Sequence, residues 1–294
     1  MGKLLWTEKQ DIGPTARTLC DLAYDATRKQ VVLFGGGIGL EFLNDTWAWN
    51  GELWTQLEDI GPSARENHAI AFDSIRERVV LFGGFTGLAD LGDTWEWDGT
   101  EWTQMADTGP SGRSGHAMTF DSKIKRVVLF GGGNQSERSG DTWSWDGTEW
   151  TQEEDTGPTA RAFHALAYDT VRDRVVLFGG PRGAESFLND TWEWDGSQWR
   201  QVADTGPAPR LGHGMVFDGT RVLLFGGGGL GGATFGDTWS WDGKHWRQIQ
   251  DIGPGPREFV AMAYDSDRSR SVLFGGNGQS GGSLGDTWEL YEHS

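Results

Sequence analysis

The stretch Asp93-Thr94-Trp95-Glu96-Trp97-Asp98-Gly99-Thr100-Glu101-Trp102-Thr103-Gln104 decides the fold. Trp95 and Trp97 stand two residues apart, so both side chains face the same side of an extended strand. Asp98-Gly99 supplies the positive φ that a tight reversal needs, and Trp102 begins a second extended run. The stretch therefore predicts a β-hairpin in which Trp97 and Trp102 lie opposite each other across the two strands.

Two more extended runs precede this hairpin and complete a unit of four strands. The run Val79-Val80-Leu81-Phe82-Gly83-Gly84 lies upstream of a variable loop, and residues 68–73 form an earlier run. Arg65 stands just before that earlier run, and the unit begins at Asp59-Ile60-Gly61-Pro62. Short runs of this kind, separated by turn residues, predict β-strands.

The unit occurs six times. An Asp-Ile/Thr-Gly-Pro segment starts at Asp11, Asp59, Asp107, Asp155, Asp204 and Asp251, so successive starts are 48, 48, 48, 49 and 47 residues apart. A period of this length with four strands per unit is typical of a β-propeller blade. We therefore expect an all-β, six-bladed propeller with four antiparallel strands per blade. The predicted blades cover residues 11–58, 59–106, 107–154, 155–203, 204–250 and 251–291.

The two ends of the sequence predict one blade between them. The last unit stops at residues 286–291 without a fourth strand, while Trp6 precedes Asp11 by the distance that separates Trp54 from Asp59. We expect residues 1–10 to supply the missing strand and to place Trp6 beside Trp288. The ring would then close as a single domain over residues 1–294, with no open sheet edge between the first and last blades.

The Gly-Gly pair that ends each second strand and the Trp of the fourth strand, at a fixed distance, resemble kelch repeats. The resemblance extends over essentially the whole chain, because six spaced copies agree. It implies a propeller that binds proteins or peptides, although a minority of kelch propellers are enzymes, such as galactose oxidase. The fold alone does not choose between these functions.

The composition excludes several classes of function. A net charge of −18 and a pI near 4.6 oppose binding to nucleic acid, which needs a basic surface. No apolar stretch approaches the roughly 20 residues of a membrane span, and residues 1–6 match neither a signal peptide nor a myristoylation motif. The single cysteine, Cys20, excludes an internal disulfide, which fits a reducing compartment or a bacterial origin equally well. We expect a cytoplasmic monomer; secretion would require a signal sequence that has been removed.

The strand order predicts that the variable loops share one end of the propeller. The connections between second and third strands differ in every blade, at residues 37–44, 85–92, 133–140, 181–189, 228–236 and 277–285. The opposite end keeps near-constant Asp-Gly turns. Variable loops on a rigid frame usually carry binding, so we expect the site at the loop-rich end, around the mouth of the central channel.

Six arginines mark that end, each six positions after the aspartate that starts its unit: Arg17, Arg65, Arg113, Arg161, Arg210 and Arg257. In some kelch propellers the arginine at this position contacts acidic peptides. The resemblance therefore implies a ring of guanidinium groups that binds carboxylates. The simpler alternative is that an arginine present in every blade pairs with an aspartate of the framework, and the sequence leaves both interpretations open.

The two positions after each arginine vary between blades, which indicates freedom from packing. We take Glu66, Asn67, Phe163, Glu258 and Phe259 as candidate ligand contacts. One position of the first strand holds His68, His116, His164 and His213, with Cys20 and Val260 in the other two blades. Because these residues lie on separate blades and exchange with apolar ones, we interpret them as structural and expect no metal site and no cofactor.

These patterns lead to a first hypothesis and two alternatives. The first is a non-enzymatic binding or scaffold module for a protein or peptide ligand, acidic if the arginines bind it. The second is a carbohydrate-binding or galactose-oxidase-like enzyme that uses the same face. It is disfavoured because Tyr24, Tyr168 and Tyr264 occupy a position that holds Phe in other blades and are therefore interpreted as core. The third is an engineered or consensus-like propeller without a natural ligand.

Overall fold

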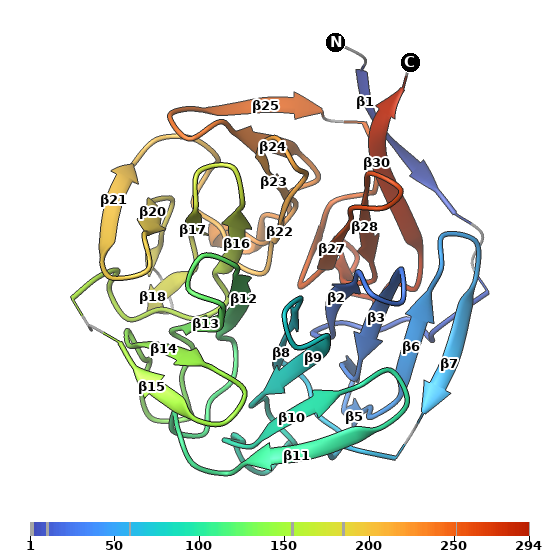
Figure 1. The fold of residues 1–294 in the computed structure, drawn as a ribbon. Helices are drawn as coiled ribbons and strands as arrows, with labels where there is room; N and C mark the ends of the chain where they lie inside the picture. The colour runs from blue at the N-terminus through green and yellow to red at the C-terminus, as the bar shows by residue number, and fades with distance from the viewer. Residues whose placement is uncertain are drawn as a thin grey trace.

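The computed structural model describes residues 3–9, 12–58, 60–153, 156–183, 186–250 and 252–293. Within these residues, six four-stranded antiparallel sheets surround a central axis (Figure 1). The predicted six-bladed propeller is confirmed. Asp11, Asp59, Asp155 and Asp251, which start four of the predicted units, fall outside the described residues. In the described part of the chain no helix has the length and apolar character needed to cross a bilayer.

The strands of each blade follow one another from the axis outward, except that β1 completes blade 6. Blade 1 contains β2 (Asp21–Asp25), β3 (Gln30–Phe34), β6 (Thr46–Trp49) and β7 (Trp54–Glu58), and blade 2 contains β8 (Ala69–Asp73), β9 (Arg78–Phe82), β10 (Thr94–Trp97) and β11 (Trp102–Ala106). Blade 3 contains β12 (Ala117–Asp121), β13 (Arg126–Phe130), β14 (Thr142–Trp145) and β15 (Trp150–Gln152), and blade 4 contains β16 (Ala165–Asp169), β17 (Arg174–Phe178), β20 (Thr191–Trp194) and β21 (Trp199–Ala203). Blade 5 contains β22 (Gly214–Phe217), β23 (Val222–Phe225), β24 (Thr238–Trp241) and β25 (Trp246–Gln250), and blade 6 contains β27 (Ala261–Asp265), β28 (Arg270–Phe274), β30 (Thr287–His293) and β1 (Lys3–Glu8).

Short strands and one 3-10 turn lie at the loop-rich end. They are β4 (Gly37–Ile38), β5 (Glu41–Phe42), β18 (Pro181–Gly183), β19 (Ser186–Phe187), β26 (Arg257–Glu258), β29 (Asn277–Gly278) and the 3-10 turn η1 (Leu230–Gly232). Backbone bonds join the start of each blade to its own variable loop: Thr18 and Gly37, for example, donate N–H groups to each other's carbonyls at 3.0 and 2.9 Å. The variable loops are therefore anchored to the frame at their first residue.

The N-terminal strand closes the ring. β1 pairs with β30, so Trp6 lies opposite Leu290 and Glu8 lies opposite Trp288 (Figure 1). Trp6 is buried in a cluster against which Trp288 also packs. The predicted closure is confirmed, and blade 6 has no unpaired outer strand at this seam.

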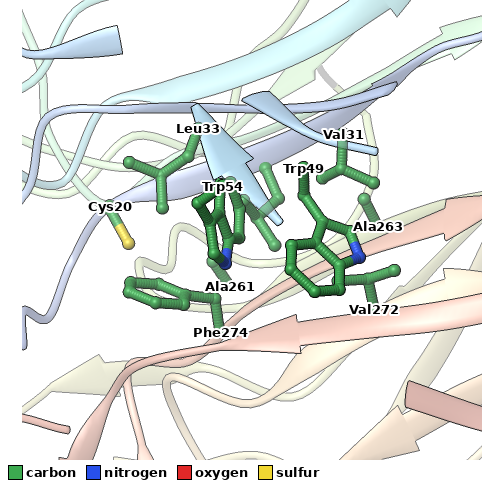
Figure 2. Packing of buried hydrophobic residues seen from close by; sticks show 10 residues of the cluster. Cys20, Val31, Leu33, Trp49, Trp54, Ala261, Ala263, Val272 and Phe274 are labelled. Atoms are coloured by element: carbon green, nitrogen blue, oxygen red, sulfur yellow. The ribbon is translucent and has the colours of Figure 1, made fainter. Parts of the chain in front are cut away.

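Aromatic residues pack between neighbouring blades. The last three residues of every second strand are apolar because both faces are covered by neighbouring blades, and Phe82 is typical, with its ring 5.1 Å from that of Trp150 in blade 3. Trp150 also donates from Nε1 to the Thr94 hydroxyl of blade 2 at 2.8 Å. Figure 2 shows the equivalent seam between blades 1 and 6, where Trp54 packs on Phe274.

The hairpin predicted around Gly99 is confirmed. Trp97 pairs with Trp102, their ring centroids are 5.6 Å apart, and Gly99 has a φ of 101°. The same tryptophan pair occurs in four further blades, at Trp49–Trp54, Trp145–Trp150, Trp194–Trp199 and Trp241–Trp246. Local turn chemistry thus fixes the register of the two outer strands.

A buried acidic network occurs in alternate blades. In blade 2 the Glu96 carboxylate forms an ion pair with Arg76 and accepts a hydrogen bond from Trp145 Nε1 of blade 3 at 2.9 Å. Glu193 and Glu289 occupy the same position in blades 4 and 6. Blade 1 has Ala48 there instead, so the buried Nε1 of Trp97 has no acceptor among the described residues.

Candidate functional site at the loop-rich end of the channel

Each arginine at the loop-rich end lies inside its own blade. Arg65 is 0% exposed, and its guanidinium donates to both oxygens of the Asp93 carboxylate, from Nη1 at 2.7 Å and from Nη2 at 2.8 Å. Nη1 also donates to the Gly83 carbonyl, Nε to the Ser63 carbonyl, and Nη2 to the Ser63 hydroxyl. All five N–H donors of the guanidinium are therefore engaged by the protein.

The same pairing recurs in the other blades, as Arg17–Asp45, Arg113–Asp141, Arg161–Asp190, Arg210–Asp237 and Arg257–Asp286. In blades 5 and 6 the hydroxyl acceptor is missing, because Ala208 and Gly255 replace Ser or Thr, but all six arginines are at most 3% exposed. Of the two interpretations that the sequence left open, the structure supports the pairing of each arginine with an aspartate of the framework and contradicts a ring of ligand-binding guanidinium groups, so the argument for an acidic ligand is lost. Carboxylates of the frame already occupy these guanidinium groups.

The arginines keep their aspartate partners ionised. Burial alone would raise the pKa of Asp93, but hydrogen bonds and the positive charge of Arg65 lower this pKa below its ordinary value. A hydrogen bond from Trp95 Nε1 to Asp93 Oδ2, at 2.7 Å, acts in the same direction. These ion pairs belong to the fold, since removing one partner would leave the other charge largely buried and unpaired.

Six residues of left-handed backbone form the mouth of the channel, and we call them the mouth ring: Leu19, Asn67, Gly115, Phe163, Gly212 and Phe259. Their φ angles lie between 54° and 66°. Successive members are linked from blade to blade, beginning with the Asn67 N–H that donates to the Leu19 carbonyl at 2.9 Å and ending with the Phe259 N–H that donates to the Gly212 carbonyl at 2.6 Å. Four members are not glycine, and left-handed backbone costs such residues about 1–2 kcal/mol each. Strain of this kind clusters at functional positions.

Two candidate contacts meet at the mouth. The rings of Phe163 and Phe259 pack edge to face with centroids 5.6 Å apart, although they come from blades 4 and 6. They reach each other across Gly212, where an added side chain would lie 2.7 Å from the Phe259 ring. Both phenylalanines are half-buried, so the pair presents an apolar surface at the mouth.

Glu66 and Glu258 lie beside the mouth ring on blades 2 and 6, with blade 1 between them. Both side chains are half-buried, and no ion pair involves either one in the part of the chain that the structure describes. Burial raises the pKa of Glu66, and burial also raises that of Glu258 despite a hydrogen bond from Asn277. Asn67 lies 3.5 Å from Glu66 Oε1 through its side-chain nitrogen. The mouth therefore carries two partly desolvated carboxylates without cationic partners.

A set of exposed apolar side chains, which we call the apolar tips, was not predicted. It comprises Leu40 (97% exposed), Leu88 (89%), Ile12 (86%), Ile60 (77%) and Ile252 (71%). All five lie on the loops of blades 6, 1 and 2. The rings of Phe42 and Phe85 join the loops of blades 1 and 2, with centroids 6.1 Å apart. The signal was present in the repeat itself, because its second position holds Ile in these three blades and Thr in blades 3, 4 and 5.

The four histidines of the first strands form part of the blade seams. His116 is buried, its ring packs against Phe82 of the preceding blade at 5.4 Å, and its Nε2 lies 3.1 Å from the Phe82 carbonyl. Burial lowers the pKa of His116 to about 3, and the pKa values of His68, His164 and His213 are lowered for the same reason. These side chains are therefore neutral at physiological pH. No cluster of three or more potential metal ligands occurs among the described residues.

A small chamber lies below the mouth ring. Its volume is about 170 Å³, and the mouth ring, the histidines and Asp21 line it. The Asp21 carboxylate accepts hydrogen bonds from the backbone N–H groups of Leu22 at 2.8 Å and Ile70 at 2.9 Å. Burial raises the pKa of Asp21 to about 7. Asp21 thus ties the innermost strands of blades 1 and 2 together inside the channel.

Comparison with known proteins identifies the family. The family model described as the KLHDC2/KLHL20/DRC7 Kelch-repeats domain matches residues 22–157 and again residues 146–292. The chain belongs to the kelch-repeat family. Among solved structures, this kelch propeller is similar to the structure of YjhT, with a TM-score of 0.79 and 15% identity over 97% of this chain and 99% of that one. At that identity the likeness supports the fold alone. A search of curated proteins finds no match.

Membership of the family supports a general role in binding or scaffolding. Within this kelch propeller, the groups that the loop-rich end presents to a ligand include the mouth ring, the two glutamates and the apolar tips, and the loops of blades 3 and 4 add Arg138 and Arg182. The six arginines are not among them. The face can therefore bury apolar side chains and pair with a positive charge, but it offers no buried guanidinium fork to a carboxylate.

Proposed function

We propose that this kelch propeller is a non-enzymatic binding module whose loop-rich face, over blades 6, 1 and 2, recognises a protein or peptide segment. The segment carries apolar side chains together with a basic group. The observation that carries the proposal is the coincidence, on three adjacent blades, of the apolar tips with two carboxylates that lack ion-pair partners among the described residues.

The negative charge of the loop-rich face favours a basic group in the ligand. Glu66 and Glu258 are partly desolvated, so a ligand cation beside either carboxylate would gain more from it than it would in bulk water. The net charge of −18 also attracts basic segments and increases their rate of encounter. An acidic ligand would meet repulsion at the same place.

The apolar tips supply the contact area. Singly exposed leucines and isoleucines are ordinary, but five on neighbouring loops form a set that is typical of interaction surfaces. The mouth ring adds a pre-formed aromatic pair, Phe163 and Phe259, held in place by backbone hydrogen bonds. A surface that is rigid before binding loses less conformational entropy when the ligand arrives.

Selection from a random peptide library displayed on phage tests the proposal. Peptides enriched on the wild-type propeller should contain Lys or Arg near large apolar residues, and their binding should weaken with added salt. The double variant Leu40→Ser, Leu88→Ser should bind them roughly 10–100-fold more weakly, because partial burial of the two leucines by the peptide would contribute about 1.5–3 kcal/mol to binding. The double variant Glu66→Gln, Glu258→Gln should bind the peptides more weakly and lose part of the salt dependence, because the rest of the negative charge remains.

Exposed apolar residues at the opposite end provide the matched control. Ile75 is 58% exposed and Val171 is 70% exposed, and both lie in turns between first and second strands. The double variant Ile75→Ser, Val171→Ser should bind the selected peptides as the wild type does. Enrichment of acidic peptides, or equal loss of binding in the control and in the leucine variant, would refute the proposed surface.

A further inference from the structure

The hairpin end of the channel opens into a second, larger cavity. Its volume is about 400 Å³, and each blade contributes one aromatic ring to its wall: Tyr24, Phe72, Phe120, Tyr168, Phe217 and Tyr264. We call this cavity the aromatic funnel. The tyrosines interpreted as core from the sequence do pack on the blade cores, but they also line this opening. The volume falls in the range of sites for small molecules.

The lining of the funnel carries no charged side chain among the described residues. Its floor consists of the aliphatic residues that separate it from the chamber under the mouth ring, namely Leu22, Ile70, Met118, Leu166, Met215 and Met262. Basic residues of the nearby turns are engaged by other parts of the protein: Arg172 pairs with Glu193, Arg268 with Glu289 at 2.6 Å, and Lys29 with Asp267 of blade 6 at 2.9 Å. A charged ligand inside the funnel would therefore lose its hydration without gaining a partner from the lining.

Free hydroxyl groups surround the rim. Ser74, Thr170 and Ser266 are exposed, line the funnel, and have no hydrogen-bond partner in the described part of the protein. The tyrosine hydroxyls, in contrast, are engaged: Tyr24 donates to Asp267 at 2.6 Å and Tyr168 donates to Asp173 at 3.2 Å. Polar recognition is thus confined to the outer edge, above an apolar and aromatic interior.

From this arrangement we propose that the aromatic funnel is a second binding site, for a small neutral molecule with a ring or branched apolar body and a hydroxyl or similar polar end. The apolar body packs among the six aromatic side chains, and the polar end meets the hydroxyls of the rim. The site lies at the opposite end of the channel from the mouth ring, so it is independent of the peptide-binding surface proposed above.

The methionines provide a direct readout. Of the five in the chain, Met118, Met215 and Met262 lie at the funnel floor, whereas Met105 is exposed on the outer strand β11. In the protein labelled with ¹³C at the methionine methyl groups, titration with the neutral aromatic probe 1-N-phenylnaphthylamine should shift the three floor signals in a saturable way. The Met105 signal should stay in place and serves as the internal control.

Two tryptophan variants localise the probe. Ser74→Trp places a large ring over the opening at an exposed position, so we expect at least tenfold weaker binding of the probe and wild-type thermal unfolding. Ile75→Trp adds the same ring one residue along the same turn, outside the funnel lining, and should leave binding unchanged. The proposal is overturned if no saturable binding occurs, if Met105 shifts with the floor signals, or if Ser74→Trp binds the probe as tightly as Ile75→Trp.

Discussion

Replacing Arg65 by methionine measures how far the buried arginines stabilise the fold. Methionine retains an unbranched apolar side chain but removes all five N–H donors from a position that is 0% exposed. The Asp93 carboxylate, 19% exposed, would keep Trp95 Nε1 as its neutral donor and would lose its counter-charge. Removing one partner of a buried ion pair costs about 3–5 kcal/mol. Domains of this kind are stable by about 5–15 kcal/mol, so the loss should be large.

Urea unfolding followed by tryptophan fluorescence gives the free energy of unfolding for Arg65→Met. The double variant Arg65→Met, Asp93→Asn should regain part of the loss, because the unpaired charge is also removed. Arg247→Met is the matched control, since the Arg247 side chain is 73% exposed and lies 3.8 Å from Asp242; it should change the stability by less than about 0.5 kcal/mol. If Arg65→Met unfolds at the same urea concentration as Arg247→Met, the assignment of Arg65 to the framework fails.

Three further predictions concern buried polar groups. Ala48→Glu should stabilise the protein by about 0.5–1.5 kcal/mol in urea unfolding, because the new carboxylate can accept from the orphaned Trp97 Nε1 and lies on the blade that carries Arg28. Asp21→Asn should be more stable than the wild type at about pH 8 and equal to it near pH 4. The pKa of Asp21 is raised from 3.8 to about 7, so between these pH values the folded wild type holds a proton that the unfolded chain releases. The stability of the wild type therefore falls as the pH rises from about 4 toward 7. For His68 the pKa is lowered to about 3, so the wild type loses stability as the pH falls from about 6.5 toward 3, and His68→Val should reduce that slope by about 1.4 kcal/mol per pH unit.

Each of these predictions has a contrary outcome. Ser240→Glu is the control for Ala48→Glu, because the next blade has Leu290 at the position where other blades carry the donating tryptophan, and a buried acid without that donor should destabilise the protein. Equal effects of the two glutamates would contradict the network described above. A stability difference for Asp21→Asn that grows toward acid pH, or parallel pH profiles for His68→Val and the wild type, would contradict the assigned titrations.

The structural features that repeat in every blade could be predicted from the sequence. Tryptophan spacing, Asp-Gly turns and the period of the units depend on local backbone geometry, so the hairpins, the number of blades and the closing strand were predictable. For Arg65 the sequence left two interpretations open, because its partner Asp93 lies 28 positions away and meets it only after the blade has folded. Pairing across such a separation is a tertiary property that no local pattern encodes.

The candidate site was predicted in part for a related reason. Glu66, Asn67 and Phe163 were recognised because they vary at a position whose neighbours are constant. The apolar tips were missed because a comparison of repeats emphasises shared positions over loop residues such as Leu40. The dual role of Tyr24 was also hidden, since an alternating strand pattern shows which side chains are apolar but not that the innermost strand borders a channel.

The pairing of β1 with β30 has a consequence for how the protein is made. β1 precedes every other strand in the sequence, and its partner is the last strand of the propeller. During synthesis β1 and Trp6 therefore remain without β30, their partner strand, until five complete blades have emerged from the ribosome. The hydrogen-bonding edges of β1 and β28 stay open until β30 appears, and such edges can pair with other chains. We expect a nascent or truncated chain that lacks β30 to depend on chaperones far more than the finished ring does.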